Sequence, residues 1–354
     1  MSSWLPGSVQ TAYRDLLELC QTAAFEDAFP EAGTFAKKTV KGRRYWYFRV
    51  QGKERYVGPE SDDLLKRIET HRKQRSDERQ RRTIVAMLKS AGLPSPTPQL
   101  GEILRTLARA GVFRLRACVV GTQAYGCYAG ILGLRLPGGS LATQDLDIAQ
   151  FRSISVAISE DERLGALIEV LRQADPSFRP LSKALGEGKP VAYVNSRKYK
   201  VEVLTPNRGP DRDDAMQLPA IGSYAHPFRF LDFLIYDAIP AVVLHGPGVL
   251  VNVPAPERYA VHKLIVSYRR QKDAAKVMKD RAQAAQLISA LWEYQQGEIR
   301  RAFDEAARRG EAWRDALSHS IPERQIPTEA AAAFQDILAN ATAEKAETAP
   351  PEPI

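Results

Sequence analysis

The sequence predicts an α+β protein: a mixed-sheet core, a helical C-terminal region and a small N-terminal αβ module. Three observations predict it. Between residues 99 and 254, short β-prone runs alternate with short helical runs, and after Pro256 the pattern is helical throughout. Residues 35–58 interleave aromatic and basic side chains in the period-two manner of short antiparallel strands.

The N-terminal module is expected to span residues 1–93. Apolar residues at near-helical spacing predict a helix over 8–29, and the aromatic and basic segment follows as two or three strands. Ser61 is suited to cap one long, charged helix over 61–91, because its hydroxyl accepts from first-turn amides. The run GLPSPTP then ends that helix.

The central domain is expected over residues 99–254 and the helical region over 255–345, with a disordered tail at 346–354. The central elements predicted are a helix over 100–110, a strand over 113–120, a helix over 123–132, a strand over 144–150, a helix over 163–174 and a strand hairpin over 190–205. The C-terminal helices predicted are 256–270, 273–294, 296–309 and 328–344.

Composition narrows the classes of protein. The chain has 354 residues and a formal net charge of +8, which suits a polyanionic partner without requiring one. Its three cysteines form no CxxC pair, which argues against a zinc site or a disulfide framework. The first residues lack the pattern of a signal peptide, and no apolar run is long enough to span a membrane, so we expect a cytoplasmic protein with no membrane contact.

Two aspartates carry the strongest chemical signal. Asp145 and Asp147 are two residues apart on a predicted strand, so both carboxylates project from one face. Crowded carboxylates repel unless a cation lies between them, and Mg²⁺ prefers such oxygen ligands. Glu202, flanked by valines on a later strand, is the expected third ligand. Gly121 allows close backbone approach to a phosphate, and Thr122 adds a hydroxyl at a helix N-terminus.

The order of these features resembles the DNA polymerase β-type nucleotidyltransferase superfamily: an apolar strand, Gly121–Thr122, a helix, then the DLDI strand. The resemblance covers residues 99–295. Within the superfamily, the chain resembles a bacterial family related to nucleotidyltransferase toxins and abortive-infection proteins. It implies a polymerase β-type nucleotidyltransferase core. One departure is the long interval before Asp145, where LRLPGGSLA is the expected insertion; it bears on the choice of base and leaves the carboxylates in place.

The helix after Pro256 supplies the expected nucleotide contacts. Tyr259, Lys263 and Arg270 follow helical spacing along one stripe. The resemblance implies that Lys263 neutralises triphosphate charge. His262 is interpreted as a packed or surface histidine. The Lys279–Asp280 pair resembles a Lys–Asp pair of the family, and an ordinary surface pair explains it equally well.

The N-terminal strands offer a candidate nucleic-acid surface. Alternation places aromatic and basic groups together, which suits stacking of unpaired bases and contact with phosphates. The residues proposed for this role are Lys38, Arg43, Arg44, Tyr45, Tyr47 and Arg49. The alternative is a small sheet whose basic face only keeps the module soluble.

We therefore expect an enzyme that moves a nucleoside monophosphate from an NTP such as ATP to an acceptor and releases pyrophosphate. The expected cofactor is Mg²⁺ in a two-ion site, with Mn²⁺ as a substitute. The expected acceptor is RNA of the tRNA type, in a toxin or phage-defence role with a partner or antitoxin protein. The alternatives are transfer to a protein or small molecule, and a non-catalytic module that senses nucleotide.

Overall fold

The structure is a computed structural model of the whole chain. It describes residues 3–28, 34–40, 43–50, 53–73, 78–136, 143–181, 189–207, 209–210, 214–270, 273–322 and 325–348. Among these residues, no helix combines the length and the apolar character needed to cross a lipid bilayer.

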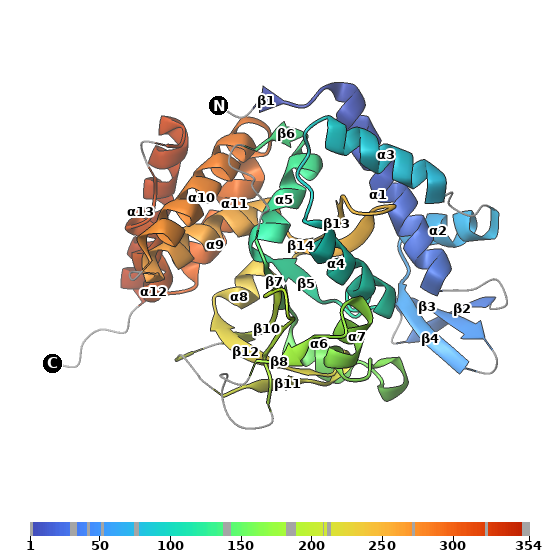
Figure 1. Ribbon diagram of the computed structural model, residues 1–354. Helices are drawn as coiled ribbons and strands as arrows, with labels where there is room; N and C mark the ends of the chain where they lie inside the picture. Colours follow the sequence, from blue (N-terminus) through green and yellow to red (C-terminus); the bar gives the residue numbers. More distant parts are fainter. Residues whose placement is uncertain are drawn as a thin grey trace.

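A mixed sheet forms the centre of the molecule (Figure 1). Its strands are β5 (Cys118–Val120), β7 (Asp145–Ala149), β8 (Arg179–Pro180), β9 (Ala192–Val194), β10 (Lys200–Asn207), β11 (Met216–Leu218) and β12 (Ser223–Arg229). The main order is β11-β12-β10-β7-β5, with β9 added to β10 and β8 to β9. Strand β10 runs parallel to both β7 and β12, whereas β5 is antiparallel to β7. The predicted α+β class with a mixed sheet is confirmed.

Helices and a two-stranded ribbon surround this sheet. They are α4 (Pro98–Ala110), α5 (Gly121–Leu132), α6 (Arg152–Ala157), α7 (Leu167–Ala174), α8 (Leu231–Leu234), the short 3-10 turns η1 (Glu160–Glu162) and η2 (Pro219–Ile221), and the ribbon of β13 (Ala238–Val243) with β14 (Val249–Pro254). Helix α4 begins where the sequence indicates, because Thr97 Oγ1 accepts from the Leu100 amide and Pro98 occupies the first turn. A small pairing of β1 (Ser3–Trp4) with β6 (Leu134–Arg135) ties the N-terminus to the end of α5.

The C-terminal helices pack on the same hydrophobic core as the sheet. They are α9 (Pro256–Arg269), α10 (Ala274–Tyr294), α11 (Gln296–Arg308), α12 (Glu311–Ser318) and α13 (Thr328–Thr348). One cluster of buried residues runs without a break from Leu100 in α4 to Ala341 in α13. The boundary expected between residues 254 and 255 therefore lies inside a continuous core.

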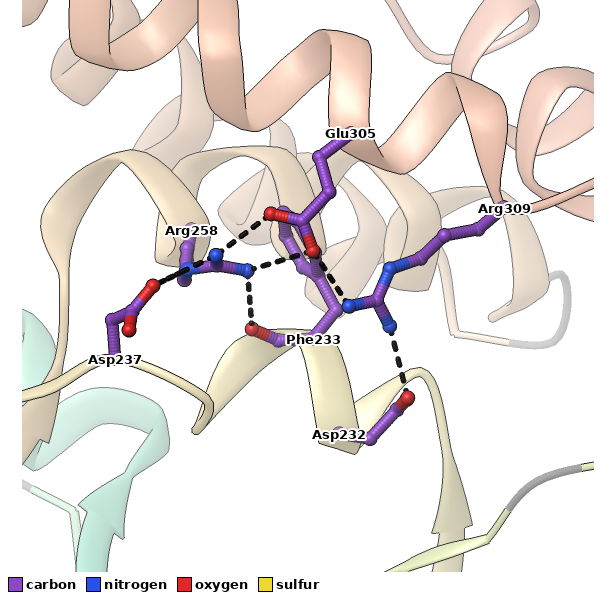
Figure 2. A network of polar contacts seen from close by, with 6 residues as sticks. All are labelled: Asp232, Phe233, Asp237, Arg258, Glu305 and Arg309. Carbon is purple, nitrogen blue, oxygen red and sulfur yellow. Dashed lines mark hydrogen bonds and ion pairs between the residues drawn. The ribbon is translucent and has the colours of Figure 1, made fainter. Parts of the chain in front are cut away.

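A buried polar network strengthens that connection (Figure 2). Arg258 of α9 donates to the Asp237 carboxylate, to the Phe233 carbonyl and to Glu305 of α11. Arg309 also donates to Glu305, through Nη2, and reaches Asp232 of α8 through Nη1 at 2.9 Å. The network joins the end of the sheet region to two C-terminal helices.

The N-terminal module has its own small sheet. Helix α1 (Gly7–Ala28) is followed by β2 (Thr34–Val40), β3 (Arg43–Val50), β4 (Lys53–Pro59), α2 (Asp62–Lys73) and α3 (Glu78–Ser90). Helices α1 and α3 pack with Val242 and Leu244 of the ribbon in a second hydrophobic cluster, and Phe48 packs with Ile68 of α2 in a third.

Some expected elements differ from the observed ones. The helix expected over 61–91 is described in two parts, α2 and α3, and the residues between Lys73 and Glu78 lie outside the described part of the chain; Ser61 accepts from the Leu64 amide as expected. The strand over 113–120 starts only at Cys118, because the chain before it turns and Arg116 adopts a left-handed φ of 68°.

Further differences concern short helices and the C-terminus. The helix expected over 163–174 starts at Leu167, and α6, α8 and α12 were not predicted because they are too short to show a clear period. Helix α13 reaches Thr348, beyond the start of the expected tail, and residues 349–354 lie outside the described part. Most of the expected insertion, residues 137–142, also lies outside it.

Candidate functional site

Strands β7 and β10 place the predicted carboxylates on one face of the sheet. Their parallel register sets Asp145 beside Lys200 and Asp147 beside Glu202. Because side chains two residues apart project to the same side, all four point to one face. On the other face, Leu146, Ile148, Val201 and Val203 are fully buried. Carboxylates on different faces of the sheet would have excluded a shared site, but these three lie on the same face.

A lysine that the sequence analysis did not single out stands among these acids. Lys200 Nζ donates to Glu202 Oε2 at 2.5 Å, and both side chains are partly buried. Glu202 is therefore held by an ammonium group, and within the described residues no three His, Cys, Asp or Glu side chains are gathered to hold a metal ion. The shared face is present, and the metal site stays a prediction. Lys200 lies two residues before Glu202, so the sequence spacing already indicated that the two side chains share a face.

Asp147 is the most perturbed acid of the group. Burial, followed by the charges of Glu202 and Asp145, raises its pKa to about 6, while Lys200 and Lys263 act in the opposite direction. No described side chain donates a hydrogen bond to it. A partly buried carboxylate with like-charged neighbours and no donor among the described side chains fits the hard oxygen-ligand chemistry of Mg²⁺.

The Gly121 turn fits tightly against Asp147. Gly121 has φ of 68°, and a Cβ placed on it would lie 2.8 Å from Asp147 Oδ2. Only glycine meets both demands, the left-handed backbone and the close approach. Helix α5 starts at this residue and has no side-chain cap, so its first-turn amides are available to an anion.

Helices α9 and α10 contact this turn from the other side. Tyr259 donates to the Gly121 carbonyl at 3.0 Å, and Lys279 Nζ donates to Thr122 Oγ1 at 3.1 Å. Tyr259 is fully buried, so it supports the turn and exposes no ring edge to a ligand. Its predicted role in nucleotide binding is accordingly indirect in this structure.

A buried aspartate holds the two predicted triphosphate-binding cations. Asp280, 2% exposed, accepts from Lys263 Nζ at 2.5 Å and from Arg270 Nη1 at 2.8 Å. Burial lowers the pKa of Lys263, and Asp280 counteracts this effect. The interpretation of Lys279–Asp280 as an ordinary surface pair is thus wrong for Asp280. His262 is packed as expected, with its pKa lowered to about 3 by burial.

The proposed nucleic-acid residues divide between the two faces of the N-terminal sheet. Strand register places Arg43, Tyr45, Tyr47 and Arg49 of β3 on one face together with Lys38 of β2. Arg44 belongs to the opposite face, where it forms an ion pair with Glu60 at 3.0 Å along the same side as the buried Phe48.

The N-terminal sheet meets the core far from the carboxylates. The Tyr56 amide of β4 donates to Glu162 at 3.1 Å, and the positive charge of Arg116 lies close enough to act on the Tyr56 phenol. Arg116 precedes the start of β5, whereas Val120 at its end pairs with Asp147. The three residues of β5, from Cys118 to Val120, separate the two contacts along the chain. The module and the acids lie near opposite ends of this strand.

Comparison with known proteins decides the family. A family model described as nucleotidyltransferase matches residues 98–308, more than half of the 354-residue chain. The chain belongs to this nucleotidyltransferase family. The matched range of this nucleotidyltransferase begins at α4 and ends with α11, so it includes both the acid-bearing strands and the helices that carry Lys263 and Asp280.

One solved structure is also similar to this nucleotidyltransferase. It is an antigenic nucleotidyltransferase-like protein from Paracoccidioides brasiliensis, with 16% identity over 66% of this chain and 98% of that chain, at a TM-score of 0.30. No curated protein matches the chain.

Proposed function

We propose that the protein transfers a nucleoside monophosphate from an NTP to an acceptor hydroxyl in a Mg²⁺-dependent reaction that releases pyrophosphate. The observation that carries this proposal is the contact of Gly121 with Asp147. It brings a phosphate-binding turn against an acid that shares a face with two other carboxylates. Nucleotidyl transfer needs these two features side by side, because the reacting phosphate must lie against the metal ligands.

Asp145, Asp147 and Glu202 would hold Mg²⁺, and Mn²⁺ would substitute because it accepts the same oxygen ligands. When bound, the cation would supply neutralisation of charge at the reacting phosphate and would lower the pKa of the acceptor hydroxyl. Glu202 must release Lys200 to take part, since its Oε2 accepts from that ammonium. The strand register places Lys200 beside Asp145 on the same face.

The triphosphate has a cationic binding surface opposite the acids. The uncapped first turn of α5 offers backbone amides, and Thr122 offers a hydroxyl already oriented by Lys279. Lys263 and Arg270, both fixed by Asp280, supply two positive charges. Fixed cations stabilise developing phosphate charge better than mobile ones, because they need little reorganisation.

For the acceptor we propose RNA. The net charge of +8 favours a polyanionic partner, and the face of the N-terminal sheet that carries Tyr45 and Tyr47 also carries basic groups. A purely sensing role is disfavoured by the complete set of three acids on one face.

The test is to incubate the protein with each α-labelled NTP, Mg²⁺ and total RNA, and to follow the label. We expect label in RNA, and none with Asp145→Ala or Asp147→Ala. Asp336→Ala is the matched control, because Asp336 is exposed on α13 far from the acids. Circular dichroism checks that all variants fold. Label transfer at the wild-type rate by both site variants would refute the catalytic assignment, and label in protein would redirect the acceptor assignment.

A further inference from the structure

Three tyrosines form a continuous surface on the N-terminal sheet. The rings of Tyr45 and Tyr56 lie 6.2 Å apart between centroids, and those of Tyr47 and Tyr56 lie 5.6 Å apart. Tyr56 is 45% exposed, and the other two are half-buried. We call these three residues the tyrosine face.

The tyrosine face is not needed for the core of its sheet. Phe48 and Ile68 fill that core on the opposite side, where α2 covers the strands. A solvent-facing sheet face usually carries small polar or charged residues, whereas this partly exposed one presents aromatic rings. The rings therefore need an explanation other than internal packing.

Cations surround the rings. Lys38 Nζ lies 4.7 Å from the centre of the Tyr47 ring, and Arg43 and Arg49 flank the tyrosines on the same strand face. Glu54 forms ion pairs with Lys38 and Arg49 and is the one acidic group in their register on this face among the described residues of β2, β3 and β4. Beside Tyr56, the core adds one acid, Glu162, and one cation, Arg116. Rings interleaved with an excess of positive charge are complementary to unpaired bases and their phosphates.

We propose that the tyrosine face binds single-stranded nucleic acid, with bases stacked on Tyr45, Tyr47 and Tyr56 and phosphates contacted by Arg43 and Arg49. A duplex does not fit this chemistry, because its bases are already stacked on one another. The inference rests on the proposed function only for the use made of the strand, namely as the acceptor of nucleotidyl transfer. Compared with the nucleic-acid-binding residues expected from the sequence, the tyrosine face adds Tyr56 and leaves out Arg44.

The test is fluorescence anisotropy with a labelled single-stranded RNA of about 12 nucleotides, within the roughly 4–16 nucleotides covered by single-strand-binding folds. NTP and divalent cations are omitted, so the result does not depend on catalysis. Affinity should fall with salt, with a log–log slope of about −0.7 for each phosphate contacted. Arg43→Ala should make that slope shallower by about 0.7.

Tyr56→Ala should weaken binding by about 5-fold to 150-fold, the range that corresponds to loss of one stacked base. Tyr56→Phe should retain most of the affinity, because phenylalanine stacks without the hydroxyl. Tyr294→Ala and Arg301→Ala are matched controls: Tyr294 is 58% exposed on α10, and Arg301 is an exposed cation of α11. Both should bind like the wild type.

A single-stranded DNA of the same sequence identifies the source of the strand. Equal binding means that stacking and charge suffice, and preference for RNA means that the 2′-hydroxyl is also contacted. The inference is overturned if the wild type shows no salt-dependent binding, if duplex RNA binds as tightly as the single strand, or if Tyr56→Ala and Arg43→Ala bind like the controls. Binding without label transfer would refute the proposed function alone, and label transfer to RNA without such binding would refute this inference alone.

Discussion

The charge of Asp147 lowers the free energy of unfolding by an amount that depends on pH. Its pKa is raised from 3.8 to about 6 by burial and by Glu202 and Asp145. The carboxyl is neutral below pH 3.8 and charged above pH 6 in both the folded and the unfolded chain. The loss of unfolding free energy caused by its charge is therefore absent at low pH and complete at high pH. The difference of 6 − 3.8 corresponds to about 3 kcal/mol.

We therefore expect Asp147→Asn to raise the free energy of unfolding of the metal-free protein by up to about 3 kcal/mol above pH 6, with the gain disappearing below pH 3.8. Urea unfolding in the presence of a chelator measures it. Asp336→Asn on the exposed face of α13 should show no such gain. In saturating Mg²⁺ the sign should reverse, because the variant has lost a ligand; a gain that persists unchanged in Mg²⁺ contradicts the assignment of Asp147 as a ligand.

Lys200 should compete with the metal for Glu202, since its ammonium already occupies Glu202 Oε2 at 2.5 Å. Removing that charge in Lys200→Met is expected to tighten Mn²⁺ binding by about 10-fold, which corresponds to roughly 1.4 kcal/mol. Isothermal titration calorimetry measures the affinity directly. Lys189→Met, an exposed lysine just before β9, is the charge-matched control. Weaker Mn²⁺ binding in Lys200→Met would show that Lys200 supports the site.

At the residue scale, strand parity predicted the shared face of Asp145, Asp147 and Glu202 because side-chain direction follows directly from sequence spacing. It did not predict that Lys200 would pair with Glu202, since that pairing depends on rotamers and burial. The role of Asp280 was equally hidden: a Lys–Asp pair on a helix looks the same in sequence whether it is solvated or buried.

Asp280 of α10 connects the two helices α9 and α10 by forming ion pairs with the side chains of Lys263 and Arg270. In Asp280→Asn, burial and the charges of Arg270 and Lys279 would act on Lys263 unopposed, and its pKa would fall further. We expect a raised KM for NTP and loss of NTP affinity at a lower pH than in the wild type, measured by steady-state kinetics across a pH series.

Asp304→Asn is the control for Asp280→Asn, because Asp304 also pairs with an arginine of a helix but at the surface. It should leave KM unchanged. A merely structural role for Asp280 would lower the yield of folded protein and leave the pH dependence of KM as in the wild type. That result would contradict the positioning role.

At the element scale, long helices with clear periods were predicted closely, as α1 and α10 show. The strand expected over 113–120 failed because apolar content alone does not separate a strand from a buried turn. Val112, Phe113 and Leu115 are buried in such a turn, and Asn252 of β14 fixes it by donating to two of its carbonyls.

The sheet region and the C-terminal helices should unfold as one unit, because one hydrophobic core spans both and Arg258 bridges them. Arg258→Met removes the charge-assisted hydrogen bonds of the buried Arg258, while Glu305 keeps Arg309, and is expected to destabilise the protein by about 1.5–3 kcal/mol. Chemical unfolding followed by fluorescence and by circular dichroism measures this, and the two signals should change together.

Arg308→Met is the matched control for Arg258→Met. Arg308 also pairs with two acids, Asp304 and Glu344, but at the surface, where such pairs contribute at most about 1 kcal/mol. A similar small effect in both variants, or two separate transitions in the wild type, would instead support an independent domain after residue 254.

Strand β5 sets a minimum length for substrates. Tyr56 of the tyrosine face lies near Arg116, before the beginning of this strand, and Asp147 pairs with Val120 at its end. A short oligonucleotide can reach one place or the other, whereas a longer one reaches both and gains effective concentration at the acids. With the proposed RNA acceptor, we expect the efficiency of labelling to rise sharply at the acceptor length at which one strand reaches both places.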